Sequence, residues 1–86
     1  MTGREEVFAL LDALERGERR AASRDASGNW VPDASVKEGI LAAFRLGAEV
    51  ESAAGPFPFR DRDTLPPLAA LPAGVRVVPG GTAIRR

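Results

Sequence analysis

The sequence predicts a small α+β domain made of two helices with a β-hairpin, a proline-rich arm and a terminal strand. Three observations predict this fold class. Apolar residues recur at helical spacing in two stretches, a cluster of turn-forming residues separates those stretches, and prolines interrupt the chain from residue 55 onward. The chain has 86 residues, which is enough for a single domain of marginal stability.

The first helix is predicted over residues 3–16. Thr2 and Glu5 form a capping-box pattern at its start, and Gly17 stands where a glycine commonly ends a helix. The apolar stripe that should face the core is Val7, Leu10, Leu11 and Leu14, with Phe8 at its edge.

A β-hairpin is predicted over residues 19–31, around the turn cluster Asp25–Asn29. Its two arms are expected at Arg20–Arg24 and Asn29–Val31. Because so short a hairpin is not stable alone, we expect Trp30 to anchor it to a helix. The alternative is that Trp30 serves as a stacking platform for a base or another ring.

The second helix is predicted to begin after Pro32, with Asp33 as its N-cap, and to close at Gly47. A short strand is the interpretation of Ala48–Ser52, with Val50 pointing inward. The apolar stripe of the helix is Val36, Ile40, Ala43 and Phe44, widened by Leu41.

A proline-rich arm is predicted over residues 55–74. Residues 55–59 should be extended, because proline disfavours helix in the residue before it. The alternating charges at 60–63 are expected to be solvated. The large apolar side chains of the arm would be exposed unless they pack on the domain's own helices or on a partner, and both alternatives stay open. These side chains are Phe57, Phe59, Leu65, Leu68 and Leu71.

The pattern as a whole divides the chain into three parts. A helix–hairpin–helix core occupies residues 1–54, the proline-rich arm occupies 55–74, and a strand at Val75–Val78 opens the last part, 75–86. We expect this last part to be the entry to a second domain that is not present.

Composition narrows the classes of function. The chain contains neither Cys nor His, so it cannot form a thiolate zinc site, a cysteine nucleophile or a histidine general base. Its 12 basic and 12 acidic residues leave no net charge, which argues against nucleic-acid binding. No apolar run is long enough to span a membrane, and no signal peptide is recognised. A cytoplasmic location is therefore expected, with no nucleic-acid and no membrane partner.

Three blocks of sequence occur in a fixed order. They are Gly28–Val31, Lys37–Arg45, and Gly74–Pro79 followed by Ile84–Arg85. Together these blocks resemble the N-terminal domain of the tetrahydrodipicolinate N-succinyltransferases, over nearly the whole chain from residue 7 onward. The resemblance implies a mixed α/β domain that precedes a left-handed parallel β-helix of hexapeptide turns, a repeat that does not occur in these 86 residues.

The resemblance also implies a reaction. Enzymes of this family transfer a succinyl group from succinyl-CoA to an amino-acid-like dicarboxylate in lysine and diaminopimelate biosynthesis, as homotrimers with active sites between subunits. Their arginine in the G-x-R-V-V-P segment contacts the acceptor substrate, and the matching residue here is Arg76. A guanidinium can hold a carboxylate through two parallel hydrogen bonds and stays protonated. The alternative is that Arg76 is an ordinary surface arginine between two buried valines.

Two hypotheses of function follow from these observations. In the first, the chain is the N-terminal domain of such a succinyltransferase and is inactive alone. It then binds no cofactor, holds no catalytic or metal-binding residue, and leaves succinyl-CoA as co-substrate of the full enzyme. In the second, the chain is a non-catalytic protein–protein interaction module that docks through the apolar arm at 57–71.

Overall fold

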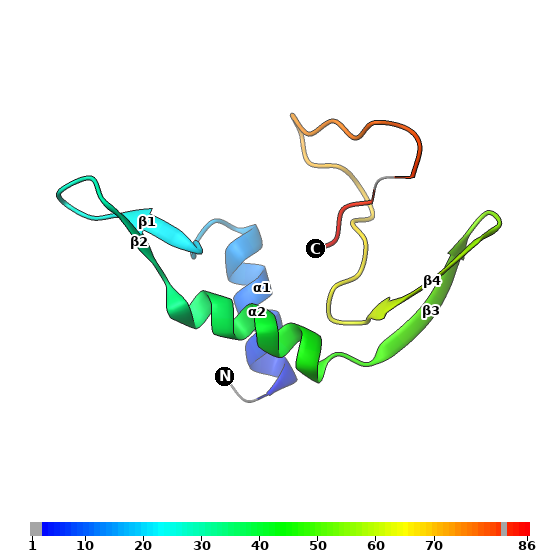
Figure 1. The fold of residues 1–86 in the computed structure, drawn as a ribbon, viewed down its shortest axis with the longest axis horizontal. Coiled ribbons are helices and arrows are strands. Elements are labelled where there is room, and N and C mark those ends of the chain that lie inside the picture. Colours follow the sequence, from blue (N-terminus) through cyan, green and yellow to red (C-terminus); the bar gives the residue numbers. More distant parts are fainter. Residues whose placement is uncertain (1–2, 82) are drawn as a thin grey trace.

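The computed structural model describes residues 3–81 and 83–86. Within these ranges the chain forms two helices and two antiparallel two-stranded sheets, which confirms the α+β class. The helices cross at the centre of the molecule and the two hairpins extend to opposite sides of them (Figure 1). In chain order the elements are α1 Arg4–Glu15, β1 Ala22–Arg24, β2 Trp30–Pro32, α2 Ala34–Leu46, β3 Glu49–Ala54 and β4 Phe57–Arg62.

Helix α1 has nearly the predicted bounds. Its N-cap is Gly3, while the predicted Thr2 cap lies outside the described residues. At the other end Gly17 has a φ of +74°, in the left-handed region that favours glycine. The N–H groups of Gly17 and of the next residue donate to the carbonyls of Leu14 and Ala13, at 3.1 and 2.9 Å. This pair of bonds is a Schellman motif, so Gly17 ends the helix as predicted.

The hairpin β1–β2 forms at the predicted place. Ala22 lies opposite Pro32, and Arg24 lies opposite Trp30. The Asp25 carboxylate builds the turn by accepting the N–H groups of Ser27 and Asn29, at 2.9 and 3.0 Å.

Trp30 does not anchor this hairpin to a helix, contrary to the prediction. Its side chain is 64% exposed, and its ring faces the Arg24 guanidinium carbon at 4.8 Å from the ring centroid. The register explains this contact, because residues directly opposite each other share a face of the sheet. Arg19 ties the hairpin to α2 instead, through Asp33 at 3.1 Å and the Ser35 hydroxyl at 2.6 Å.

Helix α2 is capped as predicted but buries only part of the expected stripe, including Val36 and Ala43. The Asp33 carboxylate accepts the Ser35 N–H at 3.0 Å, and Gly47 is the C-cap. Phe44 and Leu41, expected in the apolar stripe, are 38% and 55% exposed. The reason is that α1 packs against the side of α2 that carries small residues. The buried residues of α2 are Val36, Gly39, Ala42 and Ala43.

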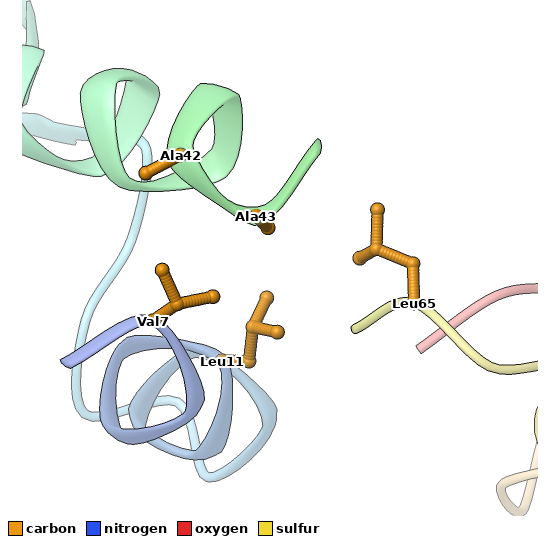
Figure 2. Packing of buried hydrophobic residues seen from close by; sticks show 5 residues of the cluster. All are labelled: Val7, Leu11, Ala42, Ala43 and Leu65. Atoms are coloured by element: carbon orange, nitrogen blue, oxygen red, sulfur yellow. The ribbon is translucent and has the colours of Figure 1, made fainter. Parts of the chain in front are cut away.

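The core lies where α1, α2 and the proline-rich arm meet (Figure 2). Leu65 comes from the arm and is 5% exposed, so at this residue the arm packs on the domain's own helices. Phe57, Phe59 and Leu71 of the same arm remain more than half exposed. The cluster consists of Val7, Leu11, Ala42, Ala43 and Leu65, with Phe8 and Leu46 packed against it.

The chain forms a second hairpin, β3–β4, where the sequence predicted one short strand followed by an extended arm. Glu49 pairs with Arg62 at one end and Ala54 with Phe57 at the other. The predicted boundary at residue 55 therefore falls in the turn between two paired strands. Val50 is 45% exposed rather than inward, because the helices do not cover this two-stranded sheet.

The charged run at 60–63 is bonded rather than merely solvated. Each of its four side chains forms a hydrogen bond or ion pair with a residue elsewhere in the chain. In sequence order the partners are Glu51, Arg85, the Gly47 carbonyl and Arg4. The run therefore holds β4 to β3, to α1, to the end of α2 and to the C-terminal residues.

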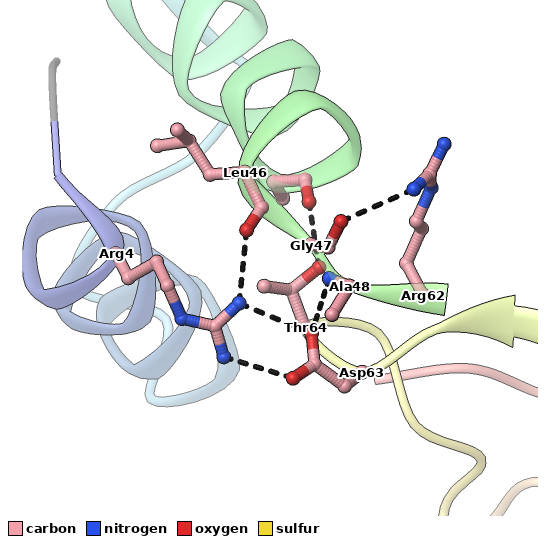
Figure 3. A network of polar contacts seen from close by, with 8 residues as sticks. Arg4, Leu46, Gly47, Ala48, Arg62, Asp63 and Thr64 are labelled. Atoms are coloured by element: carbon pink, nitrogen blue, oxygen red, sulfur yellow. Dashed lines mark hydrogen bonds and ion pairs between the residues drawn. The ribbon is translucent and has the colours of Figure 1, made fainter. Parts of the chain in front are cut away.

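Side chains from other segments cap the C-terminal end of α2 (Figure 3). The last carbonyls of a helix have no partner within it, so they need donors from elsewhere. Arg4, Arg62 and Thr64 donate to the carbonyls of Leu46, Gly47 and Ala43, at 2.9, 3.1 and 2.6 Å respectively. The capping explains why the polar Thr64 side chain can be fully buried.

Close packing explains the glycine at position 47. Its φ of −74° is ordinary for any residue, so conformation is not the reason. A Cβ at this position would lie 2.6 Å from Thr64 Oγ1 and 2.9 Å from Arg62 Cβ. Two of the three residues that cap α2, Arg62 and Thr64, thus leave no room for a side chain at Gly47.

The strand predicted at Val75–Val78 does not form; these residues are irregular. An isolated antiparallel bridge between Pro67 and Arg85 is the pairing found in this region of the described chain. Turns bound this segment on both sides, at Pro72–Val75 and at Gly80–Gly81, and no described strand pairs with it.

Candidate functional site

Residues 67–85, here called the C-terminal loop, leave the body of the molecule and return to the same place (Figure 1). Backbone hydrogen bonds close the base of the loop. The Leu68 N–H donates to the Ile84 carbonyl, and the Arg86 N–H donates to the Pro66 carbonyl, both at 2.9 Å. The loop therefore has a defined root, from which the segment carrying Arg76 extends.

Two turns bracket that segment. Before it, the Val75 N–H donates to the Pro72 carbonyl at 3.2 Å, and Gly74 has a φ of +83°. After it, Gly80 and Gly81 have φ values of +123° and +113°. Such positive values are costly for residues with a Cβ, which explains the glycines on both sides.

Arg76 is exposed on this loop. Within the described residues its guanidinium has no hydrogen-bond or ion-pair partner. Val75 is 42% exposed and Val77 is half-buried, so the two flanking valines are not buried as the alternative expected, although Arg76 does lie on the surface as that alternative also expected. The cation is therefore open to a ligand, and a guanidinium is suited to bind a carboxylate with two parallel hydrogen bonds.

Arg76 does not line either of two shallow hollows found on the described surface. One, of about 290 Å³, lies between α1, α2 and the chain end and is mostly apolar; it is lined by Leu11, Leu14, Glu15, Ile40, Leu65 and Arg86. The other, of about 310 Å³, lies on β3–β4 and is lined by Glu51, Ser52, Pro58, Phe59 and Arg60. Arg76 is thus a single contact, which can bind and orient an anionic group.

Arg85 and Arg86, to which the sequence assigned no role, fasten the base of the loop. Arg85 Nε donates to Asp61 Oδ2 at 2.8 Å. Hydrogen bonding by Arg85 is the main reason that the pKa of the Asp61 carboxyl lies below its ordinary value. Arg86 Nε donates to Glu15 Oε1 at 2.6 Å, and the same guanidinium pairs with Asp12. No local pattern signals these pairs, because the partners lie 24 to 74 residues apart.

The described residues contain no group of three or more side chains suited to holding a metal ion. Neither helix of the described structure is long and apolar enough to cross a membrane.

Comparison with known proteins identifies the family. Residues 2–46, more than half of the chain, match the family model described as tetrahydrodipicolinate N-succinyltransferase N-terminal. The chain belongs to this family. The match covers α1, β1, β2 and α2, which together form the helix–hairpin–helix core.

Curated relatives extend the match beyond the core. A protein of Leptothrix cholodnii is 36% identical over 95% of this chain and 32% of its own length. A protein of Delftia acidovorans is 34% identical over 94% of this chain and 31% of its own. One of Rhodopseudomonas palustris (strain BisB5) is 45% identical over 62% of this chain and 19% of its own. All three are named 2,3,4,5-tetrahydropyridine-2,6-dicarboxylate N-succinyltransferase.

The share of each sequence that these matches cover shows whether Arg76 lies within the region of similarity. The chain spans about a third or less of the length of these curated relatives. The Leptothrix cholodnii relative leaves only 5% of the 86 residues unmatched, so Arg76 falls inside the region of similarity. The resemblance recognised in the three sequence blocks is confirmed over nearly the whole chain.

Proposed function

We propose that this chain is the N-terminal domain of a succinyl-CoA-dependent N-succinyltransferase, which acts on tetrahydrodipicolinate in lysine and diaminopimelate biosynthesis. Membership of the family over residues 2–46 and the names of the relatives support the proposal. The observation that carries the site is Arg76, whose exposed guanidinium has no partner among the described residues and lies on a loop inside the region of similarity. Arg76 would bind a carboxylate of the acceptor.

The reaction is an acyl transfer. The neutral amine of the acceptor attacks the thioester carbonyl of succinyl-CoA, an amide bond forms, and coenzyme A leaves as the thiol while the amine loses a proton. Such a step needs orientation of the amine, a proton acceptor and stabilisation of the oxyanion that develops. Arg76 contributes orientation only, and the other groups belong to parts of the protein beyond these residues.

The remaining features of the protein belong to the same proposal. The relatives are about three times as long as this chain, which leaves room for a left-handed β-helix domain that carries the catalytic groups. We place the active sites between the subunits of a homotrimer in the cytoplasm. The partners of this domain are then the dicarboxylate acceptor and neighbouring copies of the same protein.

Thiol release tests the proposed reaction. The native gene product that contains this chain is incubated with succinyl-CoA and 2-aminopimelate, an acceptor that carries an amine and two carboxylates. We expect free thiol to appear only when both substrates are present, and none to appear with the 86-residue chain alone. Absence of acceptor-dependent thiol release by the native product would contradict the proposed function, and turnover by the 86-residue chain would contradict its inactivity alone.

A second candidate function is a non-catalytic interaction module, which the hairpin β3–β4 favours. Its register places Val50, Phe57 and Phe59 on one face of the sheet, where they are 45%, 65% and 51% exposed. Exposed apolar side chains gathered on one face favour a docking surface. A stable, monodisperse monomer of the 86-residue chain in light scattering would count against self-association through this face.

A further inference from the structure

The C-terminal loop is fastened at its base rather than along its length. Within the described residues, the backbone hydrogen bonds inside the loop join loop residues to one another, as those from Leu68 to Ile84 and from Val75 to Pro72 do. The ion pairs that tie the loop to the helices and hairpins are made by Arg85 and Arg86. Arg76 lies nine residues before Arg85 and ten before Arg86, so its position depends on the base.

Arg85 contacts two elements at once. Its guanidinium faces the Asp61 carboxylate of β4 through two parallel bonds, one of them from Nε at 2.8 Å. The guanidinium carbon also lies 5.2 Å from the centroid of the Phe44 ring of α2. The paired hydrogen bonds to Asp61 need the two N–H donors of a planar guanidinium, and the contact with the Phe44 ring needs a flat cation. A lysine could therefore not replace Arg85 fully.

Arg86 fastens the loop to the remaining helix. Its side chain is 19% exposed, and it lies between the Asp12 and Glu15 carboxylates of α1. A partly buried cation between two carboxylates is less screened by salt than an exposed pair. Arg85 and Arg86, here called the arginine clamp, therefore join the loop to α1, α2 and β4.

We infer that the arginine clamp positions Arg76 for acceptor binding, although neither of its arginines touches the acceptor. The inference rests on the proposed function, in which Arg76 binds a carboxylate. A free loop would have to be ordered when the acceptor binds, at a cost in entropy, whereas a clamped loop presents Arg76 in place beforehand. Loss of the clamp should weaken acceptor binding and leave succinyl-CoA binding unchanged.

Charge reversal across the Arg85–Asp61 pair tests the clamp in the native gene product. Arg85→Asp and Asp61→Arg should each raise the KM for the acceptor roughly tenfold or more, because small displacements of a binding group are costly. The KM for succinyl-CoA should not change. The double variant restores an ion pair and should recover most of the loss. A role in stability alone would not separate the two KM values in this way.

The Glu51–Arg60 pair supplies a matched control. It joins β3 to β4 at 2.6 Å, is highly exposed and does not touch the loop. Reversal of both charges there should leave both KM values unchanged. Arg85→Lys is a milder variant in case Arg85→Asp fails to fold, and it should raise the acceptor KM by a smaller factor than the reversal.

The outcomes separate this inference from the proposed function. If Arg76→Ala raises the acceptor KM while both Arg85 variants retain the wild-type value, the clamp inference is wrong. If Arg76→Ala itself leaves the acceptor KM unchanged, the proposed role of Arg76 fails, and the clamp has nothing to position.

Discussion

Single arginines hold this chain together at points where segments distant in sequence meet. Arg4 shows the principle, because its guanidinium forms two bonds with Asp63, at 3.0 and 3.1 Å, and a third with the Leu46 carbonyl at 2.9 Å. Hydrogen bonding by Arg4 is the main reason that the pKa of the Asp63 carboxyl is lowered. A hydrogen bond from the Ala48 N–H lowers this pKa further. One lysine, Lys37, occurs in the chain, and an ammonium group could not make such planar paired contacts.

Residues with local roles could be predicted from the sequence, and those with distant partners could not. Asp33 and Gly17 act within one turn of their own helix, so their neighbours in sequence reveal them. The two partners of Arg86, Glu15 and Asp12, lie 71 and 74 residues away, and nothing in the nearby sequence marks these pairs. The role proposed for Arg76 rests on family resemblance, since exposure alone distinguishes it poorly from other arginines.

Asp33 should make stability depend on pH in acid. Hydrogen bonds from Ser35 and Arg19 lower its pKa from an ordinary 3.8 to about 2. Because the pKa of Asp33 is lower in the folded chain, its ionised carboxylate stabilises the fold at pH values above the ordinary pKa of 3.8. This stabilisation is lost as the pH falls from about 3.8 through about 2. Urea unfolding at pH 4 and pH 2 should therefore show a larger loss of stability for the wild-type chain than for Asp33→Asn.

Asparagine is the suitable replacement because it caps helices as well as aspartate but does not titrate. Other carboxyls titrate equally in both proteins and cancel in the comparison. Glu38→Gln, an exposed change in the same helix, serves as the control and should behave like the wild type. Identical losses for the wild type and Asp33→Asn would contradict the role of the cap.

At the scale of elements, periodicity predicted the helices, but packing decided which faces are buried. In α2 the large Phe44 and Leu41 were expected inside, yet the helix turns Ala42 and Ala43 toward α1. Apolar spacing alone does not tell which side of a broad stripe the neighbour will cover. The hairpin β3–β4 was missed in part because Pro58 suggested an irregular arm, although proline is tolerated in an edge strand.

Leu65 is the point at which the proline-rich arm enters the core. Leu65→Ala should destabilise the 86-residue chain by about 2–5 kcal/mol, because it removes buried methyl groups and leaves a cavity against α1 and α2. Leu71→Ala, a change of the same chemistry in the same arm at a residue that is 53% exposed, should cost no more than about 0.5 kcal/mol. Urea unfolding followed by circular dichroism measures both; equal effects would place the arm outside the core.

At the scale of the whole molecule, the chain exposes more surface than a closed domain of its mass. Its accessible surface is 6656 Å², whereas a folded monomer of 9.1 kDa is expected to expose about 4,900 Å². Its radius of gyration is 15.4 Å, against about 12 Å for a compact chain of this length. The hairpins and the C-terminal loop account for the difference, since they extend from a small core (Figure 1).

This open shape fits a domain that completes its surface against other parts of a larger protein. In the enzyme that we propose, the exposed apolar face of β3–β4 and the protruding C-terminal loop would be contacts with its other parts. The sequence could indicate such an arrangement through the apolar arm, but it could not give the shape, because the shape depends on the distant ion pairs at the loop base.

The role of Arg76 is tested most directly by separate KM values for the two substrates in the native gene product. Arg76→Ala should raise the KM for 2-aminopimelate roughly tenfold to a hundredfold, the loss expected for a charge-assisted hydrogen bond, and leave the KM for succinyl-CoA unchanged. Arg45→Ala, at another exposed arginine, should change neither value. An equal rise in both KM values, or no rise in either, would contradict the account of this chain as an acceptor-binding domain.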